Sequence, residues 1–264
     1  MSDCSFKSIV IGDSRLCGFD RKNTGEIDID FVIIRGAHVN DVLVPALDKI
    51  RSLQTFEGGI LIIKIALGIN HFTEFVRHGQ GVELKYSGAT GCQVFNELRS
   101  FKQRIKSVRP DALVGFVTVP TISFVANKNY RLEAGKLKSS IYSDEQLQCF
   151  QITLDQEITL LNFKLKEENS FKQDGHNRGC MTVSWHKYVT RSSKRKRNKQ
   201  STKSQTVVRN NFSGLYDGIH AISTLKQKWF YDLCACIRKE QSYTLYEKSK
   251  TVHVSLEDTS DSEA

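Results

Sequence analysis

Short, almost wholly apolar runs alternate along the chain with longer stretches whose apolar residues recur at helical spacing. The apolar runs cover residues 9–11, 29–34, 60–67 and 112–119, and the helical patterns cover about 40–54, 94–108, 147–165 and 223–239. Strands that are apolar at consecutive positions fit a parallel sheet that is buried on both faces. The alternation therefore predicts an α/β fold with three layers and a doubly wound, mostly parallel sheet.

The chain has 264 residues, a length that suits one such domain, and we assign it to residues 5–240. Two segments depart from the globular composition. Residues 191–210 are predicted to be a flexible, basic insertion, since cations crowd its first part: Arg191, Lys194, Arg195, Lys196, Arg197, Lys199 and Lys203. Residues 245–264 are predicted to be a disordered acidic tail, because the segment after Lys250 contains four Asp and Glu residues and no Lys or Arg.

The sequence predicts neither a secretion signal nor a membrane span. The first strand begins within about six residues of Met1, and no apolar run reaches the roughly 18 residues that a span requires. The seven cysteines are an odd number without paired spacing, which favours reduced thiols. We therefore expect an intracellular protein, cytoplasmic or nuclear, and the spacing of its histidines and cysteines predicts no metal and no cofactor. The oligomeric state is left open.

Three of the predicted strands end in residues suited to a ligand site. Ser14 follows the first strand in the sequence Gly12-Asp13-Ser14, Gly36 follows the second, and Asn70 follows the third. In a doubly wound sheet these strand ends lie side by side at the edge where ligands bind. Each feature alone is most often an ordinary strand-end turn. Their joint placement instead predicts a site that contains a hydroxyl, an amide and free backbone N–H groups.

A second candidate element, Asp217 and His220, precedes the last predicted helix. A serine nucleophile needs a base to accept its proton, and that base needs an acceptor to orient it. An Asp three residues before a His supplies both groups from one short loop. The same Asp also suits a structural turn in which its carboxylate accepts backbone hydrogen bonds.

Together these four sequence blocks resemble the SGNH, or GDSL-type, hydrolases. They are Gly12-Asp13-Ser14, the glycine at 36, Gly68-Ile69-Asn70 and Asp217-x-x-His220, and they occur in the family's order over residues 7–239. The resemblance implies a flavodoxin-like three-layer fold and hydrolysis of esters, thioesters or acetylated sugars. Similar domains occur in proteins encoded by some retrotransposons, and the basic segment is compatible with such an origin.

The resemblance also implies the roles of individual residues. Ser14 would be the nucleophile, His220 the general base and Asp217 its partner, while the oxyanion hole would comprise the backbone N–H groups of Ser14 and Gly36 and the side chain of Asn70. Two positions depart from the family pattern. His71 follows Asn70 where an aspartate is usual, and Arg15 follows Ser14 where a small or apolar residue is usual, placing a cation beside the nucleophile.

Two functions from different classes follow from the sequence. The first is a serine esterase or deacetylase that acts on a small acyl ester or acetylated substrate. The alternative is a catalytically weak or inactive binding module that contacts nucleic acid through Lys194, Arg195, Lys196, Arg197 and Lys199. The segment 191–203 also suits a solvated loop or a tag for an import receptor.

Overall fold

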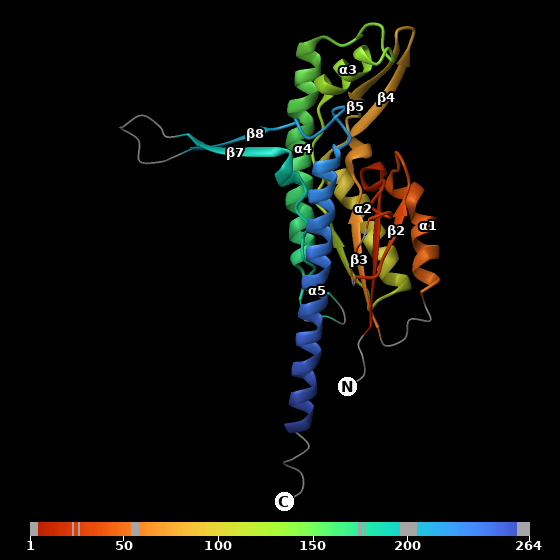
Figure 1. Cartoon of the computed structure of the whole chain (residues 1–264), viewed down its shortest axis with the longest axis vertical. Helices are drawn as coiled ribbons and strands as arrows, with labels where there is room; N and C mark the ends of the chain where they lie inside the picture. Colours follow the sequence, from red (N-terminus) through yellow and green to blue (C-terminus); the bar gives the residue numbers. More distant parts are fainter. Residues whose placement is uncertain are drawn as a thin grey trace, which may run out of the picture.

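The computed structural model describes residues 5–22, 24, 25, 27–53, 59–173, 176, 178–195 and 205–257, and of residues 191–195, 205–209 and 248–257 it describes the backbone alone. Its central sheet contains four parallel strands in the order β2-β1-β3-β6, and Figure 1 labels β2 and β3 of this sheet. These strands are β1 (Phe6–Gly12), β2 (Ile29–Ile33), β3 (Ile60–Ala66) and β6 (Leu113–Phe116). The predicted α/β class and mostly parallel sheet are confirmed.

The strand order places β1 inside the sheet, with β2 on one side and β3 on the other. The chain therefore winds first in one direction and then in the other, as in doubly wound folds. Gly12, the last residue of β1, pairs with Ile33 of β2 and with Ala66 of β3. The three strands consequently end at the same level of one sheet edge.

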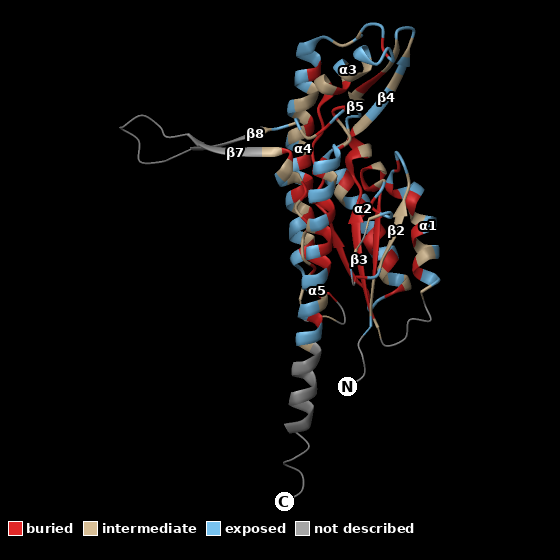
Figure 2. Cartoon of the chain, in the orientation of Figure 1, coloured by how far each residue is buried: buried red, intermediate tan, exposed pale blue. Residues whose placement is uncertain are grey.

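Helices cover both faces of the sheet and complete three layers. On one face lie α1 (Val39–Arg51), α2 (Gly91–Val108) and α4 (Asp144–Ser170), and on the other lies α5 (Ser223–Glu257). Figure 2 shows the burial concentrated on the strands and on the sides of the helices that face them. Within the described residues, no helix combines the length and apolarity needed to pass through a membrane.

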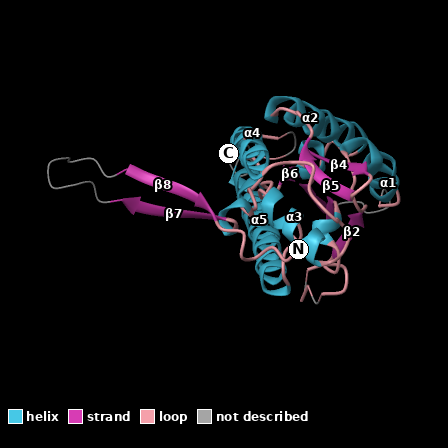
Figure 3. Cartoon of the chain, turned by 90° about the horizontal axis from the view of Figure 1, so that it is seen from above, coloured by secondary structure: helices cyan, strands magenta, loops and turns pink. Residues whose placement is uncertain are grey.

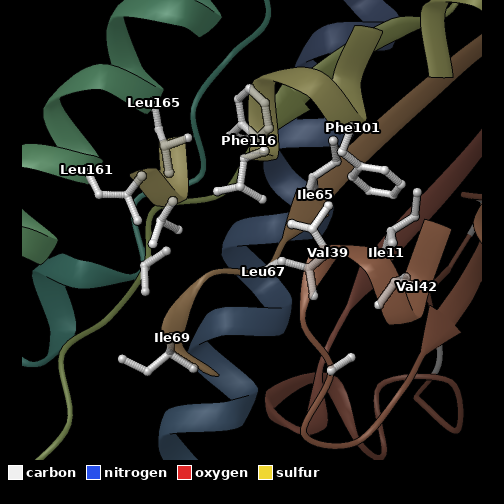
Figure 4. Packing of buried hydrophobic residues seen from close by; sticks show 14 of the residues in the cluster. Ile11, Val39, Val42, Ile65, Leu67, Ile69, Phe101, Phe116, Leu161 and Leu165 are labelled. Carbon is white, nitrogen blue, oxygen red and sulfur yellow. The ribbon is translucent and has the colours of Figure 1, made fainter. Parts of the chain in front are cut away.

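Alternate residues of β1 supply both halves of the hydrophobic core. Ile9 and Ile11 pack into the cluster on the α1 side, whereas Val10 packs into the cluster on the α5 side. Figure 4 shows Ile11 and Ile65 of the sheet beside Val42 of α1. Burial of each such side chain contributes about 1.5–3 kcal/mol. The consecutive apolar residues of these strands thus reflect two buried faces.

Capping residues determine where the covering helices begin. Thr90 accepts the backbone N–H of Gln93, whose side chain in turn accepts that of Thr90, and α2 follows directly. Ser143 and Gln146 form the same reciprocal arrangement before α4. At its other end α2 stops at Arg109, because the following proline disfavours helical geometry in the residue before it.

Two segments to which the sequence patterns assign neither a strand nor a helix contain regular structure. Residues 71–90 form a hairpin of β4 (Thr73–His78) and β5 (Gly81–Tyr86), preceded by a short 3-10 helix, η2 (Ile69–Phe72). The alternation of Val82, Leu84 and Tyr86 with polar residues is a strand signal that the glycines nearby obscured. Within 121–143 lies α3 (Phe124–Glu133).

Two further expectations need correction. The segment 191–210, expected to be a flexible loop, contains β7 (Thr190–Arg195) and β8 (Gln205–Asn210), which pair antiparallel and project from the body of the protein (Figure 3). The tail expected to be disordered over 245–264 is helical as far as Glu257, and residues 258–264 lie outside the described residues. The helix continues because residues 241–257 contain neither glycine nor proline.

A buried ion pair joins the middle of the sheet to α5. The Lys64 ammonium on β3 donates to Glu240 Oε1 on α5 at 2.6 Å, and both side chains are fully buried. Lys64 also donates to the Met181 carbonyl at 2.8 Å and contacts Cys180 Sγ at 3.0 Å. Burial raises the pKa of the Cys180 thiol to about 12, so this thiol is uncharged at neutral pH. The countercharge of Lys64 is therefore the Glu240 carboxylate.

We expect Lys64→Met to lower the free energy of unfolding by about 3–5 kcal/mol, since it leaves a buried carboxylate without its closest cation. The double variant K64M/E240Q removes both charges and should lose less stability than K64M alone. Urea denaturation followed by tryptophan fluorescence measures both, because Trp185 and Trp229 are fully buried and stacked. Equal stability of K64M and the wild type would contradict the expectation.

Candidate active site

Ser14 lies where β1 leaves the sheet. It begins a 3-10 turn, η1 (Ser14–Leu16), and the Asp13 side chain caps this turn by accepting the backbone N–H of Arg15 at 3.0 Å. The turn lies close to the sheet, since a Cβ at Gly12 would approach the Ala66 carbonyl oxygen to 2.8 Å. Glycine at 12 and Asp at 13 thus explain why the chain turns here and presents the hydroxyl of residue 14 at the sheet edge.

His220 and Asp217 occupy a tight loop just before α5. The loop closes on itself through a hydrogen bond from Tyr216 N to the His220 carbonyl at 3.0 Å. Asp217 Oδ1 accepts the backbone N–H groups of Ile219 at 3.0 Å and His220 at 2.6 Å. The structural turn expected from the sequence is therefore present, and it occupies one of the two carboxylate oxygens.

Contacts with α3 hold this loop in place. Gly218 adopts a φ of +77°, and a Cβ there would come within 2.6 Å of backbone atoms at Ser123 and Asn127. The Gly218 carbonyl accepts the Ser123 N–H at 2.8 Å, and the Asn127 side chain donates to the Asp217 carbonyl at 2.9 Å. Glycine is needed at 218 both for the backbone conformation and for the close approach to α3.

A continuous series of hydrogen bonds links the three side chains. Ser14 Oγ lies 3.2 Å from His220 Nε2, and His220 Nδ1 lies 2.7 Å from Asp217 Oδ2. Burial raises the pKa of the Asp217 carboxyl, but hydrogen bonds from the His220 ring and from two backbone N–H groups lower it by more. The net pKa lies below its ordinary value, so Asp217 is ionised at neutral pH. It can hold the proton of His220 on Nδ1 and leave Nε2 facing the Ser14 hydroxyl.

Gly36 and Asn70 line the same cavity as Ser14 and His220, a space of about 510 Å³. Gly36 has a φ of +68°, a backbone conformation that favours glycine, and it lies in the turn after β2. Among the described residues, neither the Gly36 N–H nor the Ser14 N–H finds a hydrogen-bond acceptor. The sequence-based expectation that these positions meet at one edge agrees with the geometry.

The Asn70 amide is oriented by two contacts through Nδ2. It donates to the Ala37 carbonyl at 3.0 Å and lies 3.4 Å from Asp13 Oδ2. The second distance exceeds the usual N–H···O range of 2.7–3.2 Å. One N–H of the amide is therefore firmly engaged, while the other is only weakly held near the cavity.

Its position in the sequence suggests that Arg15 places a cation beside the serine. In the structure the Arg15 side chain instead pairs with Asp13 and does not line the cavity. Its guanidinium forms a two-pronged pair with Asp13, with Nε at 2.8 Å from Oδ1 and a terminal nitrogen at 2.7 Å from Oδ2. Both side chains are almost fully buried, at 3% and 0% exposure. The arginine therefore neutralises the carboxylate behind the turn and leaves no net charge from this pair beside Ser14.

His71, the other departure from the family pattern, is directed away from the cavity. Its ring lies 4.6 Å from that of His38, and Nε2 lies 3.1 Å from the Glu97 carboxylate. Burial, and then the charge of His38, lower the pKa of His71. The orientation of Asn70 depends on Ala37 and Asp13 and involves no contact with the His71 ring.

The remaining walls of the cavity were not recognised from the sequence. They come from the turns after β1, β2 and β3, from β4, from the loops beside α3 and α5, and from α5 itself: Cys17, Arg35, Ile69, Thr73, Phe75, Ile122, Tyr216, Ile219 and Lys226. Most of these residues lie in segments to which the sequence patterns assign neither a strand nor a helix. Proximity to the four blocks was the one signal that pointed to them.

The candidate nucleic-acid contacts are not described at the side-chain level. For Lys194 and Arg195 the backbone alone is described, as part of β7, and Lys196, Arg197 and Lys199 lie outside the described residues. Within the described part of the chain, no three or more His, Cys, Asp or Glu side chains gather in a geometry that would hold a metal ion.

The pair behind the serine generates a prediction. Arg15→Leu leaves the Asp13 carboxylate buried without its cation, so we expect the free energy of unfolding to fall by about 3–5 kcal/mol. Thermal or urea denaturation measures the loss. The matched control is Arg21→Leu, because Arg21 is exposed and the change there should stay within about 0.5 kcal/mol. A small loss for R15L, similar to that for R21L, would show that the pair is dispensable.

Comparisons with known proteins found several solved structures that are similar to this chain. No protein-family model matches it, and no curated protein matches it. A GDSL-like lipase structure from Parabacteroides merdae covers 88% of this chain and 96% of its own, with a TM-score of 0.47 and 13% identity. A member of the lipolytic protein G-D-S-L family from Veillonella parvula covers 86% and 96%, with a TM-score of 0.46 and 10% identity.

A third similar structure is the psychrotrophic esterase EstA from Pseudoalteromonas, which covers 89% of this chain and 99% of its own, with a TM-score of 0.38 and 12% identity. At these scores and identities the similarity alone assigns no activity to this chain and no role to any of its residues.

Proposed function

We propose that the chain is a serine hydrolase that cleaves acyl esters, with Ser14 as nucleophile, His220 as general base and Asp217 as the partner of that base. The observation that carries the proposal is the hydrogen-bonded series from Ser14 Oγ through the His220 ring to Asp217. A serine hydroxyl is a weak nucleophile unless a base accepts its proton, and an oriented imidazole is suited to that task.

The first chemical step is attack on the ester carbonyl. Ser14 Oγ forms a bond to the carbonyl carbon while its proton passes to His220 Nε2. The imidazolium that results is stabilised by the Asp217 carboxylate, which accepts from Nδ1 at 2.7 Å. Proton transfer to a positioned base of this kind accelerates the reaction by a factor of about 10²–10⁴.

The negative charge that develops on the carbonyl oxygen needs donors. The backbone N–H groups of Ser14 and Gly36 lack protein acceptors among the described residues and lie on the walls of the same cavity. The weakly held N–H of Asn70 would turn from Asp13 to the oxyanion. The two backbone N–H groups need no such turn, and donors that are already positioned in the ground state stabilise the transition state without a reorganisation cost.

Collapse of the tetrahedral intermediate expels the alcohol, which takes the proton from His220, and leaves an acyl-enzyme on Ser14. A water molecule then repeats the attack with His220 again as the base, and Ser14 is released together with the acid. The apolar side chains of Ile69, Ile122 and Ile219 on the cavity wall suit a small acyl group. We therefore propose a small acyl ester or acetylated compound as the substrate.

The alternative hypothesis, a binding module that contacts nucleic acid through its basic segment, remains a prediction from the sequence. It depends on Lys194, Arg195, Lys196, Arg197 and Lys199, whose side chains are not among those described. No contact among the described residues favours it over hydrolysis. A retrotransposon origin and a nuclear or cytoplasmic location likewise remain predictions.

The experiment that tests the proposed function is covalent labelling by a fluorophosphonate probe. Wild-type protein should be labelled at Ser14, and labelling should disappear in Ser14→Ala and in His220→Ala. Ser107→Ala is the matched control, since Ser107 is an exposed serine on α2 and its loss should leave labelling unchanged. Folded wild-type protein that resists the probe would refute the proposal.

The role of Asn70 has a separate test. If its amide donates to the oxyanion, Asn70→Ala should reduce kcat for a 4-nitrophenyl ester by about 10²–10³. Circular dichroism would establish that the variant is folded, because Asn70 also anchors the chain at Ala37. Unchanged turnover of a folded N70A protein would remove Asn70 from the oxyanion hole.

A further inference from the structure

Two cations line the cavity that contains Ser14. Arg35 lies in the turn after β2, immediately before Gly36, and Lys226 lies in the first turn of α5, six residues after His220. Arg35 is exposed and Lys226 is half-buried. The two side chains come from separate elements that meet only in the tertiary structure.

No described residue neutralises either cation. The described residues that line the cavity include no Asp or Glu, and neither Arg35 nor Lys226 takes part in an ion pair within the described part of the chain. Arg15, by contrast, is paired with Asp13 behind the turn. The positive charge of Arg35 and Lys226 is therefore available to a molecule in the cavity.

The surrounding groups reinforce this charge. Lys226 belongs to the first turn of α5, so the positive end of the helix dipole lies on the same side of the cavity as its ammonium group. The nearest carboxylate of the proposed machinery, Asp217, lies behind the His220 ring and is occupied by that ring and by two backbone N–H groups. It does not line the cavity. Apolar walls lower the local screening, so a charge inside interacts more strongly than it would in water.

We infer that the ester cleaved here carries an anionic group, such as a carboxylate or phosphate, close to the scissile carbonyl, and that Arg35 and Lys226 select it. This inference rests on the proposed function, since it concerns the substrate of the same site. The charge resides in the acyl group or in the alcohol, since Arg35 next to Gly36 and Lys226 of α5 both lie on the wall of the cavity that contains Ser14.

Two matched pairs of synthetic esters test the inference. For charge in the acyl group, 4-nitrophenyl monoadipate is compared with 4-nitrophenyl hexanoate. For charge in the leaving group, 3-carboxy-4-nitrophenyl butyrate is compared with its 3-carbamoyl analogue. The readout is the ratio of kcat/KM for the anionic ester to that for its neutral partner. We expect a ratio of about ten or more in the wild type for at least one pair.

Variants assign the preference to the two cations. Arg35→Gln and Lys226→Gln should each lower the ratio about fivefold, R35Q/K226Q should abolish it, and R35K should retain it. Arg104→Gln and Lys228→Gln are matched controls, because both residues are exposed cations outside the cavity, on α2 and α5. Added salt should lower the wild-type ratio of kcat/KM for the anionic ester to kcat/KM for the neutral ester, since ions screen partly exposed charges.

The possible outcomes are separable. Equal kcat/KM for both members of each pair, or a preference that survives in R35Q/K226Q, would overturn the inference while fluorophosphonate labelling of Ser14 still upheld the proposed function. Absence of both labelling and ester turnover in folded wild-type protein would overturn the proposed function and this inference with it. A preference that is confined to one pair and lost in the double variant would support the inference and identify which half of the ester carries the charge.

Discussion

The parallel pairing of β1 with β2 on one side and β3 on the other is the constraint on which the site depends. Gly12 is in register with Ile33 and Ala66, so the chain leaves the three strands at one level. Ser14, Gly36 and Asn70 follow within a few residues of those positions. A slip of one residue in this register would reverse the faces of the apolar side chains, and the two-sided core strongly disfavours such a slip.

The charges at this sheet edge are distributed unevenly: they cancel in the pair behind the Ser14 turn, whereas the cavity wall carries positive charge. Asp13 and Arg15 form an ion pair behind the turn, so the carboxylate next to Ser14 is neutralised. Asp217 is directed to the His220 ring. Arg35 and Lys226 remain on the cavity wall as charges without a protein partner among the described residues. The local charge of the cavity therefore depends on which cations are paired, and the net charge of the chain does not predict it.

Sequence patterns predicted the four parallel strands because each is a nearly unbroken apolar run, and the four large helices because their apolar residues recur at helical spacing. They failed for β4 and β5, where glycines obscured a weak alternation, and for the end of α5, where acidic composition suggested disorder although residues 241–257 contain no helix breaker. The sequence alone suggests that Arg15 places a cation beside Ser14, because no sequence pattern indicates that Arg15 forms a buried ion pair with Asp13.

By itself the sequence determined the α/β class and the five candidate residues Ser14, Gly36, Asn70, Asp217 and His220, because these lie within short motifs at predictable ends of strands and helices. Only the tertiary structure decided that Ser14 lies 3.2 Å from His220, that Arg15 is directed inward, and that Arg35 and Lys226 share one cavity. Those facts depend on contacts between elements distant along the chain. Packing of the whole core determines such contacts, and they cannot be predicted from the local periodicity of the sequence.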